Sequence, residues 1–329
     1  MTQDIDLLHF GMGKCMSTSL QQLWRESKQV RYVDTRELSW KVNAKLIECV
    51  QKEKAIPPID LPLGQVGNEL PLIISNEEFT FSFTTAPHLA PFLPLKQKYI
   101  ANQLQHRAKR LLLIVRSPMS WIKSAHSERI HKGGFETMTE YLDNLGPLVT
   151  AMTNVRQFLS YWEDSWDRLT IVPMELFVKS PDQFWKIYVD ELGLPKPTDT
   201  SAMNVKNKTN KDSVETAAAL NKLLFYNSKL AEKYSPEPNY NNLVSNKQIV
   251  GAMDSARMNG TYLALNRASQ EEIQAIQEYI NFVPNPDFGR LSLSIQMREH
   301  LEKNFIETLR PWPHMAEWLD RYANELAQV

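Results

Sequence analysis

Residues 7–24 read LLHFGMGKCMSTSLQQLW and combine a short apolar run, a turn with two glycines and a segment with helical spacing. The run from Leu7 to Phe10 is predicted to form a strand that ends at a glycine. Leu20, Leu23 and Trp24 then recur at the spacing of one helix face, so a helix should follow the turn. A strand, a tight turn and a helix in this order form the opening unit of an α/β fold.

The same alternation continues along the chain. Apolar runs predict further strands near residues 30–33, 70–75, 110–115 and 169–173, and helical patterns occupy 95–108, the segment after Pro118 and 184–195. The run RLLLIV at 110–115 is continuously apolar, as expected of a strand buried on both faces, and is predicted to be the centre of the sheet. Strands that alternate with helices imply a parallel sheet with helices on both faces, that is, a three-layer α/β fold.

The last third of the chain has a different character. Helices are expected at 215–233, 270–281, 295–309 and 313–327, whereas 198–214 and 234–262 are rich in Asn, Ser, Lys and Pro and predict loops. Ser269 with Glu272 predicts a capping box. Since no linker is sharp enough to separate a second domain, we expect one domain over 1–329, with an α/β core at 1–210 and a helical, loop-rich C-terminal part at 211–329.

Composition narrows the classes of function. The 329 residues include 37 basic and 38 acidic side chains, which argues against a nucleic-acid binder that works through its overall charge. The two cysteines, Cys15 and Cys49, form no CxxC or Cys/His cluster, so neither a disulfide framework nor a structural zinc site is indicated, and a reducing compartment such as the cytoplasm fits best. No stretch approaches the roughly 20 apolar residues that cross a bilayer, so no integral membrane segment is expected.

The turn at 11–19 has the chemistry of an anion site. Backbone N–H groups of such a turn and of the helix N-terminus after it converge on one place. Gly11 and Gly13 let the backbone bend, Lys14 adds a positive charge, and three hydroxyl donors follow: Ser17, Thr18 and Ser19. The alternative is an ordinary turn with a solvated lysine and capping hydroxyls. The pattern is not a Walker A loop, which requires G-x-x-x-x-G-K-[ST].

The segment KCMSTSL at 14–20 resembles the 5′-phosphosulfate loop of the sulfotransferase family, approximately P-K-x-G-T-T-S-L. Members of this family use 3′-phosphoadenosine 5′-phosphosulfate (PAPS) as the sulfuryl donor. Met16 stands where the family usually has glycine, so its side chain must point away from the phosphate.

A second segment, VRSPMSWIKSAH at 115–126, is similar to the 3′-phosphate motif of that family, R-D-P-x-x-R-x-x-S after a strand. Arg116 and Ser124 match its arginine and serine, whereas Ser117 replaces the aspartate and Trp121 the second arginine. An arginine at the carboxyl edge of a sheet and a serine about two helical turns later can both face a phosphate there.

A third segment, LIISNEEF at 72–79, resembles the strand ending in S-S-E of many bacterial and Golgi-type sulfotransferases, where the glutamate is the suspected base. Ser75 and Glu77 align with its serine and glutamate. Glu78 is an alternative base, and so is His88, because cytosolic sulfotransferases use a histidine. The resemblance covers roughly residues 6–210 and implies a P-loop-like, nucleotide-binding core.

The resemblance implies in-line transfer of a sulfuryl group from PAPS to a hydroxyl or amine, with no metal. Lys14 would stabilise the leaving group, and Glu77 would act as general base. The 5′-phosphate would lie on the turn amides, Gly13 included, and on the hydroxyls at 17–19, and the 3′-phosphate on Arg116 and Ser124. The acceptor would be a small molecule, a lipid, a carbohydrate or a peptide tyrosine, and the sequence decides neither the acceptor nor the oligomeric state.

Two other classes of function stay open. A P-loop-type kinase or nucleotidase should show a Walker lysine-hydroxyl pair and a magnesium-binding aspartate at the end of a neighbouring strand. A non-catalytic module that binds a 3′-phosphonucleotide would need Arg116 and Ser124 but neither Lys14 nor Glu77.

Overall fold

The computed structural model describes residues 5–13, 15–52, 54, 56–59, 70–77, 87–198, 200, 211–233 and 246–329. The chain forms two compact units. The first comprises Met1–Trp121, Leu145–Lys206 and Leu293–Val329, and the second comprises Ile122–Asn144 and Asn207–Ser292. The two units interleave along the sequence, because the last helices of the chain belong to the unit that contains the sheet.

The first unit contains a five-stranded sheet in the order β2-β3-β1-β4-β5, and all of its pairs are parallel. The strands are β1 (Ile5–Gly11), β2 (Arg31–Asp34), β3 (Leu72–Ser75), β4 (Ala108–Val115) and β5 (Leu169–Pro173). Each predicted strand is confirmed, and so is the parallel α/β fold. The prediction that 110–115 forms the centre of the sheet is wrong, because β1 is the middle strand. Both β1 and β4 have a strand on each side, so burial alone does not distinguish them.

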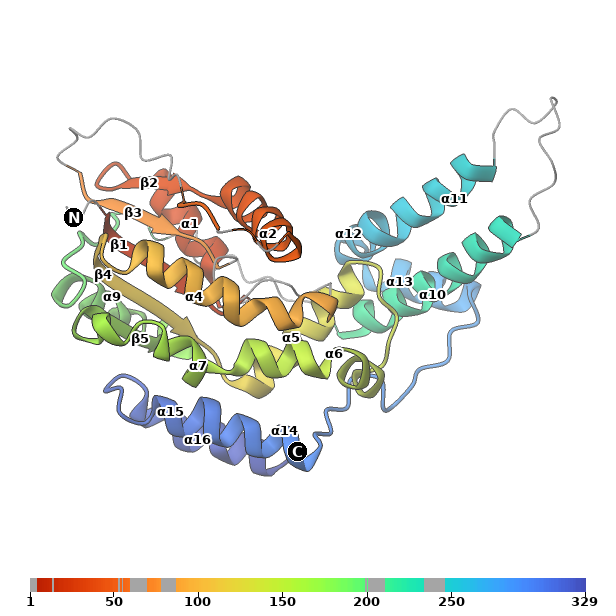
Figure 1. Cartoon of the computed structure of the whole chain (residues 1–329). Helices are drawn as coiled ribbons and strands as arrows, with labels where there is room; N and C mark the ends of the chain where they lie inside the picture. Colours follow the sequence, from red (N-terminus) through yellow and green to blue (C-terminus); the bar gives the residue numbers. More distant parts are fainter. Residues whose placement is uncertain are drawn as a thin grey trace. The chain divides into compact units, whose positions relative to one another are not determined.

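Helices cover both faces of this sheet (Figure 1). His9 on β1 faces Trp24 of α1 (Ser17–Glu26), with 5.3 Å between the ring centroids, and Trp24 Nε1 donates to the hydroxyl of Tyr188 on α9 (Pro181–Asp190) at 2.9 Å. The next residue, Phe10, packs against Phe158 of α7 (Val155–Ser160) at 5.3 Å on the opposite face. Because successive strand side chains alternate, α1 and α9 form one layer and α7 belongs to the other.

The first unit also contains helices from the N-terminal part of the chain and from its C-terminal part. The former are α2 (Arg36–Gln51), η1 (Pro87–Phe92), α4 (Leu93–Leu104), η2 (Glu163–Arg168) and α8 (Met174–Lys179), and the latter are α14 (Ile295–Leu301), η5 (Glu302–Ile306), α15 (Glu307–Leu309) and α16 (Ala316–Ala327). Phe305, Leu309 and Tyr322 are fully buried, and η5 contacts both α7 and α16. Two helices, α5 (Pro118–His131) and α6 (Met138–Thr153), cross the boundary between the units.

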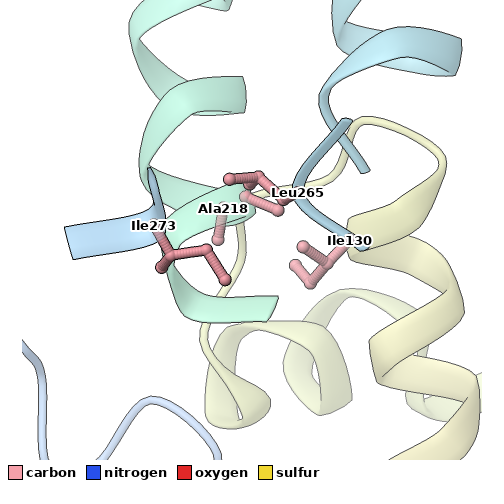
Figure 2. Packing of buried hydrophobic residues seen from close by; sticks show 5 residues of the cluster. Ile130, Ala218, Leu265 and Ile273 are labelled. Carbon is pink, nitrogen blue, oxygen red and sulfur yellow. The ribbon is translucent and has the colours of Figure 1, made fainter. Parts of the chain in front are cut away.

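The second unit is helical and has its own core. Its elements are α10 (Lys211–Lys233), α11 (Asn246–Ser255), η4 (Ala256–Gly260), α12 (Thr261–Arg267) and α13 (Gln270–Tyr279), with the adjoining parts of α5 and α6. Figure 2 shows Ile130, Ala218, Leu265 and Ile273 pointing toward one another from these helices, and all four are buried.

Two local predictions in this unit have clear outcomes. The capping box is confirmed, because Ser269 Oγ accepts from the N–H of Glu272 at 3.2 Å and Glu272 Oε2 accepts from the N–H of Ser269 at 2.7 Å. Residues 246–262 are helical, whereas their composition predicted a loop. Packing of Leu265 into the core overrides the weak helix propensity of the Asn- and Ser-rich stretch before it.

Candidate functional site

The candidate site lies where the chain reverses its direction across the sheet. From β1 the chain runs to β2 on one side, whereas from β4 it runs to β5 on the other. In open parallel sheets, ligands bind at this position, outside the carboxyl ends of the strands. The two turns concerned are adjacent, since the N–H of Met12 donates to the carbonyl of Ile114 at 3.3 Å.

The turn after β1 leads into the N-terminus of α1, where the N-cap residue supplies no side-chain cap. A Cβ at Gly11 would lie 3.2 Å from the carbonyl oxygen of Ile114, so glycine permits the close approach of β1 to β4 here. Met16 is the N-cap residue of α1 and has left-handed backbone angles, φ 65° and ψ 10°. Glycine adopts this conformation without strain, which gives a physical reason for the glycine in the family motif. The Met16 side chain makes no capping hydrogen bond.

Ser17, the first residue of α1, has a buried hydroxyl. The residue is 2% exposed, and its Oγ has no hydrogen-bond partner among the described residues. Thr18 is exposed and Ser19 is half-buried beside it. Uncapped N–H groups together with an unpartnered buried hydroxyl favour an anion at this N-terminus. Lys14 lies outside the described residues, so its place in this turn stays a prediction.

The turn after β4 holds Arg116 and Ser117. Burial raises the pKa of the fully buried Cys15 thiol well above its ordinary value, the charge of Arg116 lowers it, and the charges of Glu175 and Glu77 raise it. These three charged groups therefore lie around the turn at 11–17. Because its pKa is raised, Cys15 is a neutral thiol there and not a reactive thiolate.

Trp121 connects the start of α5 to this turn. It is 1% exposed, and its indole Nε1 donates to the carbonyl of Gly13 at 2.8 Å. Trp121 is thus a buried residue that holds the turn in place.

Ser117 contacts two carboxylates. Its N–H donates to Glu175 Oε1 at 3.1 Å, and its hydroxyl donates to Glu325 Oε2 at 2.5 Å. An aspartate at this position, as in the family motif, would place a third carboxylate beside these two.

The carboxyl end of β3 leads to Glu77 through residues held by scaffold contacts. Ser75 Oγ lies 2.8 Å from His9 Nδ1 and accepts from Gln21 Nε2 at 3.1 Å. The N–H of Asn76 donates to the carbonyl of His9 at 3.1 Å. Burial lowers the pKa of His9 to about 3, so His9 is neutral. Ser75 is thus satisfied by protein partners, and the half-buried Glu77 begins the turn that follows.

Other predicted site residues stay predictions. Glu78 lies outside the described residues, and His88 falls in η1 but its side chain is not described. Ser124 is half-buried on α5 and belongs to the second unit, so the structure does not test its pairing with Arg116.

Sequence reasoning missed several residues that shape this site. Glu175 belongs to the segment PMELF at 173–177, which resembles the family motif Y-E-D-L and is expected to be scaffold. Nothing in the sequence around His9, Tyr322 or Glu325 marked them for such a role. Within the described part of the chain, no three His, Cys, Asp or Glu side chains are grouped to hold a metal ion. None of the described helices combines the length and apolarity needed to span a membrane.

Comparisons with known proteins show a structural likeness without a match at the level of sequence. No protein-family model matches the chain, and no curated protein sequence matches it. Among solved structures, a sulfotransferase from Alicyclobacillus acidocaldarius is similar at 13% identity and a TM-score of 0.40, over 82% of this chain and 98% of that chain.

Proposed function

We propose that the chain is a sulfotransferase that moves a sulfuryl group from PAPS to a hydroxyl or amine acceptor. One observation carries the proposal: the N-terminus of α1 lies at the switch point of the sheet, next to the turn that carries Arg116, and among the described residues it has neither a side-chain cap from Met16 nor a partner for the buried hydroxyl of Ser17. A helix N-terminus next to an arginine favours a ligand with more than one anionic group. The sequence resemblance at 14–20 and 115–126 implies that this ligand is the sulfuryl donor PAPS.

The donor would be held at two places. The turn amides from Gly13 onward and the hydroxyls of Ser17, Thr18 and Ser19 would bind its 5′-phosphate, and Arg116 with Ser124 would bind its 3′-phosphate. When bound, the donor supplies the activated sulfuryl group. Lys14, next to the neutral Cys15, would stabilise negative charge on the leaving phosphate.

Glu77 would remove the proton of the acceptor. Its charge acts on the Cys15 thiol, which supports a position close to the turn that contains Lys14. The hydrogen bond from Asn76 to His9 fixes the backbone that leads to Glu77. General base catalysis of this kind contributes about 10² to 10⁴ in rate.

The binding experiment compares 3′,5′-ADP with 5′-AMP by titration calorimetry. The protein should bind 3′,5′-ADP more tightly than 5′-AMP. Arg116→Ala should reduce this ratio of affinities about ten- to hundredfold, since a hydrogen bond to a charged group contributes about 1.5 to 3 kcal/mol. Arg110→Ala is the matched control, because Arg110 is an exposed arginine on β4, the strand that precedes Arg116, and it donates to the carbonyl of Glu191. Equal affinity of the wild type for the two nucleotides would refute the donor assignment.

The activity experiment follows transfer from radiolabelled donor to a panel of alcohols, amines, carbohydrates, lipids and tyrosine peptides. Lys14→Ala should abolish transfer and leave the thermal midpoint of the ligand-free protein nearly unchanged, whereas Lys28→Ala, which changes an exposed lysine just after α1, should retain transfer. A protein that prefers 3′,5′-ADP but transfers to no acceptor would instead be a non-catalytic binding module.

A further inference from the structure

We propose that the C-terminal helix α16 completes the nucleotide site, with Tyr322, Glu325 and Glu175 acting as positioning residues for the turn that carries Arg116. This inference rests on the proposed function for its ligand. The contacts that carry it lie within the first unit.

The first step concerns Ser117, the neighbour of Arg116. Ser117 is 1% exposed, and its N–H and hydroxyl both donate to carboxylates, those of Glu175 at 3.1 Å and Glu325 at 2.5 Å. Its carbonyl accepts the N–H of Trp121 at 2.8 Å, which joins it to the first turn of α5. Three hydrogen bonds to three different residues therefore fix the backbone next to Arg116.

The second step concerns what holds the two carboxylates. Glu175 Oε2 accepts from the hydroxyl of Tyr322 at 2.6 Å, and Glu325 Oε1 accepts from Arg321 Nε at 3.2 Å. Burial raises the pKa of Tyr322 above its ordinary value, and the nearby charge of Glu175 raises it further, so the phenol stays protonated and donates. Tyr322 and Glu325 are three residues apart and lie on one face of α16. The helix α16 therefore contacts Ser117 directly through Glu325 and indirectly through the hydrogen bond from Tyr322 to Glu175.

The third step connects this network to both predicted phosphate positions. The same first turn of α5 holds the turn after β1, through the bond from Trp121 Nε1 to the carbonyl of Gly13 at 2.8 Å. Displacement of Ser117 would thus change the position of Arg116 relative to the N-terminus of α1. Because a charged hydrogen bond depends on donor position, small displacements reduce the discrimination between nucleotides with and without a 3′-phosphate.

The binding test uses Tyr322→Phe, Glu325→Ala and Glu325→Gln. We expect the first two variants to reduce the preference for 3′,5′-ADP over 5′-AMP by about three- to tenfold, with little change in 5′-AMP affinity. Glu325→Gln keeps an acceptor for the Ser117 hydroxyl and should recover part of the preference. Glu317→Ala is the matched control, because it removes an exposed glutamate from the same helix. A general loss of stability would instead weaken the binding of 3′,5′-ADP and 5′-AMP to the same extent.

Hydrogen exchange of the ligand-free protein tests the positioning role without any nucleotide. Peptides covering the end of β4 and the start of α5 should exchange faster in Tyr322→Phe and Glu325→Ala than in Glu317→Ala. If exchange there matches the control, or if both variants keep the wild-type nucleotide preference, the inference is overturned and the proposed function stands. If the wild type shows no preference, the proposed function fails, and the exchange result alone decides whether α16 holds this turn.

Discussion

Replacing Ser17 by alanine should stabilise the ligand-free protein and weaken nucleotide binding. Ser17 is 2% exposed, and its Oγ finds no partner in the part of the chain that the structure describes. A buried hydroxyl without a hydrogen bond costs about 1 to 3 kcal/mol. Alanine also has a helix propensity better than that of serine by up to about 0.7 kcal/mol. Against these gains stands the small void left by the missing oxygen, so we expect a net stabilisation of about 1 kcal/mol.

The effect on binding should have the opposite sign. If the Ser17 hydroxyl donates to the 5′-phosphate, its loss removes a hydrogen bond to a charged group, about 1.5 to 3 kcal/mol, and 3′,5′-ADP should bind about ten- to hundredfold more weakly. If Ser17 only capped or packed the helix, its truncation would lower the stability of the protein. Opposite changes in stability and affinity therefore identify a group that the fold holds ready for a ligand.

Urea unfolding followed by tryptophan fluorescence measures the first effect, and titration calorimetry the second. Ser19→Ala is the control for stability, because it makes the same chemical change two residues later on the same helix at a half-buried position. Ser19 is half-buried whereas Ser17 is buried, so both variants gain helix propensity, and the gain from removing a fully buried hydroxyl is expected for Ser17→Ala. Destabilisation of Ser17→Ala by about 1 kcal/mol or more relative to Ser19→Ala would refute the reasoning.

Three further predictions address the base, the pH dependence and the turn after β4. Glu77→Gln should lower kcat by about 10² or more and leave 3′,5′-ADP affinity unchanged, whereas Glu78→Gln should be mild; transfer kinetics showing the reverse would move the base to Glu78. Burial lowers the pKa of His9 from 6.5 to about 3, so its contribution to stability is present above pH 6.5 and is lost as the pH falls toward 3. Urea unfolding should therefore show about 2 kcal/mol lost through this group between pH 7 and pH 5, and an unchanged pH dependence in His9→Asn would contradict the assignment. Ser117→Asp should lower the thermal midpoint and the preference for 3′,5′-ADP through repulsion between carboxylates, and the double variant with Glu325→Gln should recover part of both; no recovery would mean that the charge of Glu325 is not the cause.

The fold was largely predictable because its signals are local. All strands except β2, which reads RYVD, contain a short apolar run, and the runs at 110–115 and 169–173 are followed directly by residues that begin a turn or helix. The position of β1 at the middle of the sheet was not predictable in this way. Strand order depends on which runs pair, and β4 is as continuously apolar as a middle strand would be.

The site was predictable only in part. The turn at 11–19 has a recognisable anion-binding composition, and Arg116 follows a clear strand, so these residues could be proposed from the sequence. The partners that hold them are distant along the chain. Ser117 and Glu325 are 208 residues apart and His9 and Ser75 are 66 apart, and such pairs leave no spacing pattern to find in a single sequence.

The interleaving of the two units has a consequence for synthesis of the protein. Residues 293–329 are made long after β1, yet they pack in the same compact unit as β1 and supply two residues of the network at Ser117. At about 5 to 20 residues per second, on the order of ten to thirty seconds separates the translation of Trp121 from that of Leu293. During this interval the nascent sheet lacks α16, and the turn that carries Arg116 lacks the carboxylate of Glu325. The turn that carries Arg116 therefore acquires all of its hydrogen-bond partners only after Glu325 has been translated.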